Sequence, residues 1–285
     1  MNAGIWGGLS ALSLGTADFL ARFTTRGMGK ESTVFGILAF GVAFLTGISI
    51  LSHQSFAYTA SSIRLLAVNG VSTTAMTLLL YQGLARGPVT VVAPIVASYP
   101  ALIVVFDLVM GDVPTLPQWI GMGMTIVGAI VVGRFAGAEP RAATRGARED
   151  RITIVISVAA AVAYAILVIS GQAAIQSRGA IQALWLGRVI SFLALCALMM
   201  VRRIRPTIPR RWWPALSIQA LLDAGGYLLL LFGSGGEGGR IAAVVGSSFG
   251  AVTTLLGWLV LREAIGKIQW VGIACVFAGA AILSG

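Results

Sequence analysis

The sequence predicts an all-α integral membrane protein with ten transmembrane helices. Hydrophobic residues make up 57% of the 285 residues and charged residues only 11%, whereas roughly a quarter of an ordinary soluble domain is charged. Most charges fall in short gaps between apolar runs of roughly 20 residues, the helix length that crosses a ~30 Å hydrocarbon core. Because backbone groups find no partner in lipid and the runs are continuously apolar, they predict helices rather than barrel strands.

The second observation behind this fold class is an internal repeat. The motif Gln-Trp-Ile-Gly at residues 118–121, with Gly128-Ala129 after it, returns near the C-terminus as Gln-Trp-Val-Gly at residues 269–272, with Gly279-Ala280 after it. The second copy starts five helices after the first, and an odd number of crossings reverses its direction. We therefore predict two inverted five-helix repeats, a build typical of secondary transporters.

The first repeat is predicted at residues 1–135. Its opening run follows no basic segment and carries Asp18 and several glycines instead of a cleavage site, so we expect a retained span rather than a signal peptide. In the fourth run, Pro100 deprives one helix carbonyl of its donor and predicts a local break. The five predicted spans are residues 3–21, 33–51, 64–85, 89–110 and 116–134.

The second repeat is predicted at residues 152–285, after a basic linker at 136–151 that has no apolar period. An arginine-rich segment between the seventh and eighth runs is followed directly by Trp212 and Trp213, which are suited to the membrane interface. The five predicted spans are residues 152–175, 180–201, 212–233, 239–261 and 265–284.

The net charge of +10 comes from arginines between the spans, so it indicates membrane topology and not nucleic-acid binding. Sixteen Lys and Arg residues follow odd-numbered helices and three lie on the opposite side. By the positive-inside rule this places the odd loops in the cytoplasm and both termini outside.

Together these features resemble the EamA-type transporters of the drug/metabolite transporter superfamily. The resemblance rests on the Gln-Trp motifs, the Gly-Ala endings, Trp6-Gly7 in the first helix, and the closures Gly111-Asp112 and Arg262-Glu263. It implies a central cavity formed by helices one, three, four, six, eight and nine, with helices five and ten peripheral. It also implies cytoplasmic termini, the reverse of the charge-based orientation. Similar proteins carry amino acids, metabolites or drugs, so the resemblance identifies no cargo.

Two charges within predicted spans lie at matching depth. At about 1.5 Å per residue, Arg188 lies about 12 Å from the side on which its helix starts, opposite the basic loops, and Asp223 lies about 14 Å from the same side. Pairing would lower the large cost that either charge incurs alone in the membrane. The pair has two interpretations: a structural lock between two helices, or a site for a zwitterion in which Arg188 takes a carboxylate and Asp223 an ammonium group.

Neighbouring polar and aromatic residues favour the substrate-site interpretation. Trp185 precedes Arg188 by three residues, and Gln219 and Tyr227 flank Asp223 at intervals of four, so we expect them on the same helix faces. Further candidates for the substrate site, each of which could equally be packing, are Tyr164, Tyr99 and its repeat counterpart Phe249.

Asp18 is the candidate for proton coupling. A carboxylate about 9 Å inside the first span is costly to keep ionised, and it could bind and release a proton as access alternates. The alternative is a solvated Asp near the end of the helix.

The predicted function is secondary active transport, most simply export of amino acids or similar amphipathic metabolites by alternating access across the inner cell membrane. Drug efflux by the same fold is one alternative, and an intramembrane enzyme acting on lipid-linked substrates is another. The sequence has no phosphate-binding loop, no paired acidic motif and no partner spacing around His53, so we expect no catalytic residue, metal or cofactor. Expected partners are a small-molecule substrate, the bilayer and, as a candidate coupling ion, the proton, in a monomer or homodimer.

Overall fold

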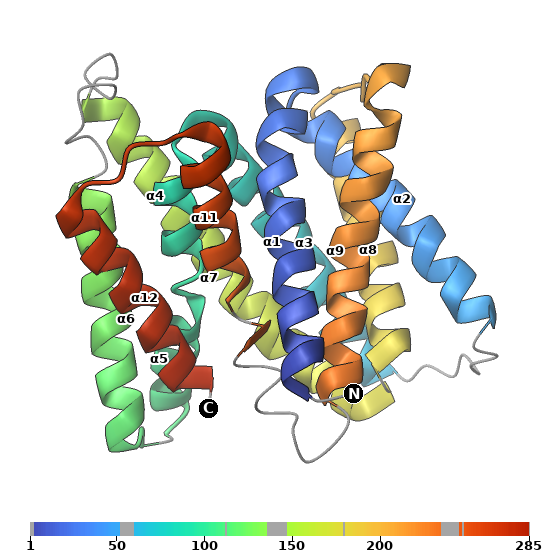
Figure 1. Cartoon of the computed structure of the whole chain (residues 1–285). Helices are drawn as coiled ribbons and strands as arrows, with labels where there is room; N and C mark the ends of the chain where they lie inside the picture. The colour runs from blue at the N-terminus through green and yellow to red at the C-terminus, as the bar shows by residue number, and fades with distance from the viewer. Residues whose placement is uncertain are drawn as a thin grey trace.

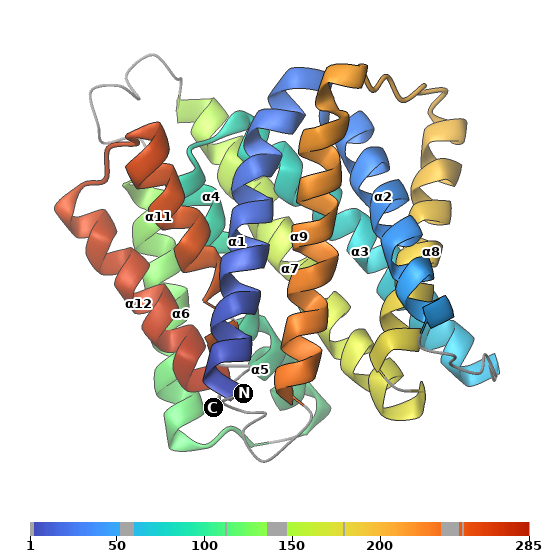
Figure 2. The same cartoon turned by 45° about the vertical axis from the view of Figure 1, so that its right-hand side comes forward.

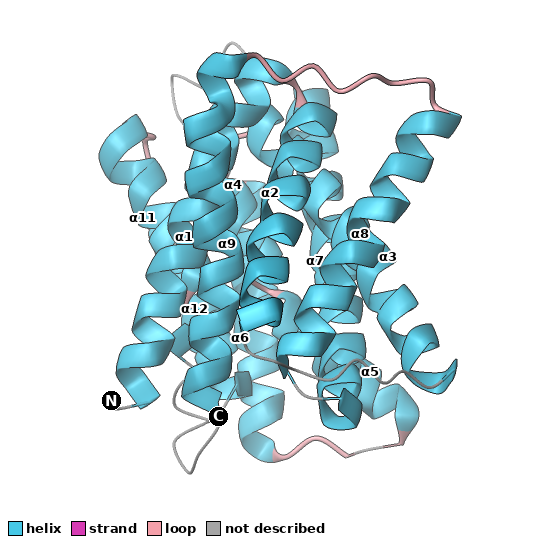
Figure 3. Cartoon of the chain, turned by 90° about the vertical axis from the view of Figure 1, so that its right-hand side faces the viewer, coloured by secondary structure: helices cyan, strands magenta, loops and turns pink. Residues whose placement is uncertain are grey.

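A computed structural model describes residues 3–51, 60–111, 113–135, 147–178, 180–234, 245–246 and 248–284. These residues form helices joined by loops and turns, with no strand among them (Figure 3). Six of the described helical segments are long and apolar enough to cross a membrane, and Phe249–Leu261 and Lys267–Leu283 are shorter apolar helices. The all-α prediction is confirmed, and the arrangement is compatible with ten spans in two inverted halves.

The helices of the first half turn where glycine or proline ends them. Gly29, at φ +85°, is the single residue between the first two helices, and Gly111, at φ 103°, follows the fifth. Both are left-handed conformations that glycine adopts without a Cβ clash. The elements are α1 (Ala3–Met28), α2 (Lys30–Leu51), α3 (Ala60–Arg86), α4 (Val89–Val96), α5 (Tyr99–Met110) and α6 (Leu116–Arg134).

The second half follows the same order. Arg262, which stands where the repeat aligns it with Gly111, is also left-handed at φ 52° and ends its helix in the same way. The described elements are α7 (Ala147–Arg178), α8 (Ala180–Val201), the short 3-10 helix η1 (Arg210–Trp212), α9 (Trp213–Ser234), α11 (Phe249–Leu261) and α12 (Lys267–Ser284).

Several predicted boundaries differ from the structure. Helix α1 continues to Met28, so Arg22 and Arg26, counted above as loop residues, lie in its last turns. Helix α7 begins at Ala147, so residues 147–151 of the predicted linker are helical. Apolar runs mark only the part of a helix within hydrocarbon, while intrahelical hydrogen bonds let the helix continue into the polar interface. Of the predicted span 239–261, only residues 245–246 and 248–261 are among the described residues.

The predicted fourth span is two helices with a break between them. The amide of Ala97 still bonds the Ala93 carbonyl, but that of Ser98 bonds Ile95, a tighter turn that ends α4. Pro100 then lies in the first turn of α5, where its missing N–H costs nothing. The break predicted from Pro100 is confirmed.

The two halves interlock through equivalent helix pairs. The most extensive contacts join α3 with α7, α6 with α12, and α1 with α9; α2 also packs on α8 (Figures 1 and 2). Exchanging the halves converts the α1–α9 pair into the α7–α3 pair and leaves the other two unchanged. This pattern is compatible with a two-fold relation between inverted repeats.

The repeated glycines form the contact between α6 and α12. A methyl group added at Gly128 would lie 2.6 Å from the Gly272 carbonyl oxygen, and one at Gly279 would lie 2.6 Å from the Gly121 carbonyl oxygen. The backbones therefore touch at two matched points, because only residues without a Cβ allow so close an approach. The pair forms one edge of the molecule (Figure 1).

We expect Gly128→Ala to destabilise the protein by about 1–3 kcal/mol, because its methyl group would push two helix backbones apart. The control is Gly123→Ala in the same helix, where an added methyl meets no atom within 4 Å. Thermal unfolding in detergent should show a lower midpoint for Gly128→Ala alone. Equal midpoints would show that the α6–α12 contact is not tightly packed.

Candidate substrate site

A cavity of about 390 Å³, its open mouth included, lies between the two halves at mid-depth. Three charged side chains line the cavity, Asp18 of α1, Arg188 of α8 and Asp223 of α9. Hydroxyl groups are supplied by Thr77, Tyr81, Tyr164 and Tyr227, and apolar walls by Leu14, Ile37, Met76, Leu80 and Phe249.

Arg188 and Asp223 form an ion pair at the cavity wall, a contact that their matching predicted depths allow. Arg188 Nη2 donates to Asp223 Oδ2 at 2.5 Å, and the side chains are 7% and 19% exposed. The guanidinium also lies over the Tyr227 ring, 5.4 Å from its centroid. A planar guanidinium keeps further N–H donors after one bond, so the pair can still receive a ligand.

An aromatic stack forms the wall opposite α8. Tyr164 of α7 lies 5.7 Å from the Phe249 ring and 4.2 Å from the Tyr99 ring, both in stacked geometry. Its hydroxyl lies 3.3 Å from the hydroxyl of Tyr227, which ties the stack to α9. Tyr164, Tyr227 and Phe249 line the cavity, whereas Tyr99 supports Tyr164 from behind.

Besides Tyr99, two predicted contact residues, Trp185 and Gln219, lie outside the cavity lining. Trp185 Nε1 donates to Thr46 Oγ1 of α2 at 2.9 Å, and the indole packs beside Leu45. Three residues fall about 60° short of a full helical turn, enough to direct Trp185 towards α2 while Arg188 faces the cavity. Trp185 therefore lies outside the cavity lining in this structure, and ligand contact by Trp185 stays a prediction.

Gln219 is fully buried one layer behind the lining. Its Nε2 donates to the Tyr81 hydroxyl at 3.1 Å, and its Oε1 accepts from Thr24 Oγ1 at 3.0 Å. Gln219 is not among the residues that line the cavity, and its predicted ligand contact stays a prediction. Tyr81, the hydrogen-bond partner of Gln219, lines the cavity instead. The sequence analysis missed Tyr81, because no spacing to another candidate residue singles it out.

Asp18 lines the same cavity as the ion pair. Because α1 runs on to Met28, its depth is about 15 Å by helix rise, greater than predicted. No ion pair joins Asp18 to a cation among the residues that the structure describes. The cavity thus holds two carboxylates and one guanidinium.

A second ion pair joins the two halves between the cavity and the basic loops. Arg22 Nη2 lies 3.2 Å from Glu263 Oε1, and Arg22 Nη1 donates to the Gly87 carbonyl at 2.5 Å. Glu263 also accepts from the amides of Val89 at 3.1 Å and Thr90 at 2.9 Å, at the start of α4. Sequence reasoning used Glu263 only as a repeat marker and missed this ion pair.

The helices around the cavity only partly match those implied by the family resemblance. Helices α1, α3, α7, α9 and α11 contribute as implied, and α6 and α12 are peripheral. The implied fourth helix, now α4 and α5, contributes no lining residue, whereas α2 and α8 supply Ile37 and Arg188.

Comparison with known proteins gives three results. The family description "EamA-like transporter family" matches residues 1–134 and again residues 151–285. A curated relative, "Uncharacterized transporter sll1319" of Synechocystis sp. (strain ATCC 27184 / PCC 6803 / Kazusa), is 24% identical over 213 residues, 72% of this chain, and the chain spans 62% of that relative's length. A solved structure, "Crystal structure of protein", has 16% identity and a TM-score of 0.65 over 98% of this chain and 95% of its own, which shows a shared fold.

Proposed function

Because the chain belongs to the EamA-like transporter family of the drug/metabolite transporter superfamily, we propose that it is a secondary active exporter of small amphipathic metabolites, with amino acids as the best-fitting class. The family and the relative named as a transporter make it a multi-pass membrane transporter rather than an enzyme. Its placement in the inner cell membrane is part of the proposal.

The observation that carries the substrate class is the composition of the cavity. Arg188 offers donors to a carboxylate, while Asp18 and Asp223 offer acceptors to an ammonium group. Leu14, Met76 and Phe249 supply an apolar wall for a side chain. An amino acid carries these three features, a carboxylate, an ammonium group and a side chain, in one small molecule.

Alternating access is supported by the closure at the basic-loop end. Arg22 of the first half binds Glu263 of the second, and this contact separates when the halves rock apart. Transporters with inverted repeats move in this way around a site at mid-depth. Drug efflux remains the second candidate, since the aromatic stack and apolar walls would also suit a lipophilic amine.

Flux of radiolabelled amino acids into proteoliposomes, with and without an imposed proton gradient, tests the proposal. Uptake of at least one amino acid above protein-free vesicles is the expected result. Uptake of lipophilic amines without any amino acid would instead establish drug efflux. No flux of either class would contradict the proposed function.

Asp18→Asn is expected to reduce proton-driven flux roughly 10-fold or more while substrate exchange continues, because the amide keeps the shape and loses the titratable proton. The measurement compares gradient-driven uptake with counterflow of the same amino acid. Equal loss of both modes would make Asp18 a packing or substrate contact. Unchanged proton dependence would remove it from coupling.

A further inference from the structure

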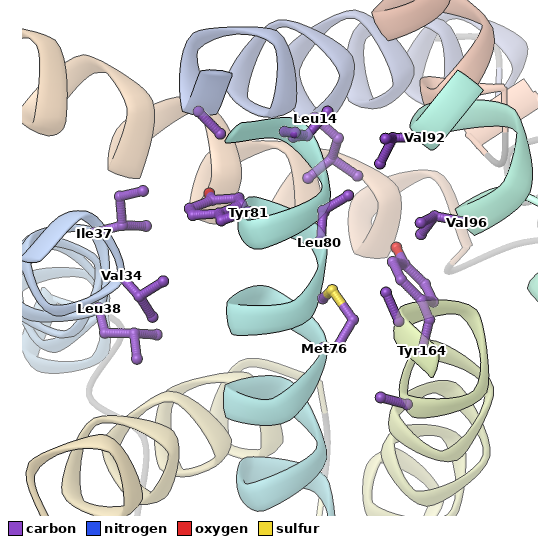
Figure 4. Packing of buried hydrophobic residues seen from close by; sticks show 14 of the residues in the cluster. Leu14, Val34, Ile37, Leu38, Met76, Leu80, Tyr81, Val92, Val96 and Tyr164 are labelled. Atoms are coloured by element: carbon purple, nitrogen blue, oxygen red, sulfur yellow. The ribbon is translucent and has the colours of Figure 1, made fainter. Parts of the chain in front are cut away.

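Tyr81 lies on α3 at the cavity, 3% exposed. Its ring extends from α3 to the side on which Ile37 of α2 lies, whereas Leu80 and Met76 of the same helix lie on the other side (Figure 4). The ring belongs to the buried hydrophobic cluster that also holds Ile37 and Leu14. Only its hydroxyl remains to interact with polar groups.

The hydroxyl of Tyr81 is oriented by Gln219. Gln219 Nε2 donates to the Tyr81 oxygen at 3.1 Å, and Gln219 Oε1 accepts from Thr24 Oγ1 at 3.0 Å. The Thr24 hydroxyl lies farther from its own helix carbonyls, 3.3 Å from Leu20 and 3.2 Å from Ala21. The Thr24 hydroxyl therefore donates its proton to Gln219 Oε1. With its amide oxygen facing Thr24, Gln219 turns its amide N–H towards the Tyr81 oxygen.

A phenol has a single proton to donate. Gln219 already acts as donor to the Tyr81 oxygen, so the Tyr81 proton does not point towards Gln219. Among the described residues no acceptor for this proton is recorded. Since Tyr81 lines the cavity, the proton is directed into it, where an acceptor atom of a bound ligand can receive it.

We propose that Tyr81 binds an oxygen of the substrate carboxylate, next to Arg188, with Gln219 as its positioning residue. The inference rests on the proposed function and deepens it. Arg188 already uses one N–H donor in its bond to Asp223. A substrate carboxylate has two oxygens, each able to accept more than one hydrogen bond. Tyr81 supplies a second, neutral donor and thereby selects substrates that have a carboxylate over amines that lack one.

The test compares L-phenylalanine with 2-phenylethylamine, which share a ring and an ammonium group and differ by the carboxylate. Binding is measured by the ligand-induced rise in thermal midpoint and by titration of the purified full chain in detergent. Tyr81→Phe is expected to weaken L-phenylalanine roughly 10- to 100-fold, the usual effect of losing a hydrogen bond to a charged group. The affinity for 2-phenylethylamine should stay within about 2-fold.

Two further variants separate this role from packing. Tyr164→Phe removes another cavity hydroxyl, one that has Tyr227 as partner, and should change both affinities by the same factor. Gln219→Met should lower the preference for L-phenylalanine only when Tyr81 is present, and add nothing to Tyr81→Phe. Gln219→Met also carries the test if Tyr81→Phe fails to fold.

The outcomes distinguish the inference from the function beneath it. If wild type binds both probes and Tyr81→Phe leaves the ratio of the L-phenylalanine and 2-phenylethylamine affinities unchanged, Tyr81 does not bind the carboxylate and the inference is overturned. An additive effect of Gln219→Met would overturn the positioning role. If neither probe binds wild type, the proposed amino-acid class fails and the inference fails with it.

Discussion

Replacing either Arg188 or Asp223 by alanine is expected to abolish measurable transport, a loss of at least about 100-fold in flux. Each substitution removes a proposed ligand for one end of the substrate and leaves the opposite charge buried without its partner. Breaking a buried pair on one side typically costs about 3–5 kcal/mol. Proteoliposome flux and thermal unfolding in detergent, measured on the same preparations, separate the loss of binding from the loss of stability.

The decisive control is the double variant Arg188→Leu/Asp223→Leu. Buried ion pairs are often replaced by apolar residues without loss of stability, so the double variant should unfold near the wild-type midpoint and still transport nothing. If the double variant regains flux together with stability, the pair is only a lock between α8 and α9. Normal flux in either single variant would exclude the zwitterion site.

Arg22→Gln is expected to open the basic-loop end of the cavity. Its ion pair with Glu263 and its bond to the Gly87 carbonyl connect α1 to the turns that lead into α4 and α12. Losing about 1.4 kcal/mol from this closure shifts the open population about 10-fold. A cysteine at Thr77, within the cavity, should then react about 10-fold faster with an impermeant thiol reagent applied from the basic-loop side.

The labelling is done after Cys196 and Cys275 have been replaced by alanine. Glu31→Gln serves as the matched control, because the Lys30–Glu31 pair is a more exposed contact at the same end of α1, with an N–O distance of 3.8 Å. Such pairs contribute little, and its labelling rate should match wild type. A rate for Arg22→Gln equal to that of Glu31→Gln would show that Arg22 and Glu263 do not hold the cavity closed.

Properties that depend on distance along the chain could be predicted from the sequence. The all-helical membrane fold follows from the length and composition of the apolar runs, and the break before Tyr99 follows from the chemistry of Pro100. The matched depth of Arg188 and Asp223 follows from helix rise, since two antiparallel helices of known start bring the charges to the same level, where the structure pairs them. The repeated glycines predicted a repeat, although not that α6 and α12 would touch through them.

Properties that depend on the rotation of each helix were decided by the tertiary structure. Trp185 shares a helix with Arg188 yet bonds Thr46, and Gln219 lies behind Tyr81 rather than in the cavity. A rotation of about 60° decides which helix a side chain meets, and it depends on how the helices pack against one another. The Arg22–Glu263 closure likewise joins residues far apart in the chain. Sequence fixes depth through a constant rise per residue, whereas only packing fixes the direction in which a side chain points and the partner that it finds.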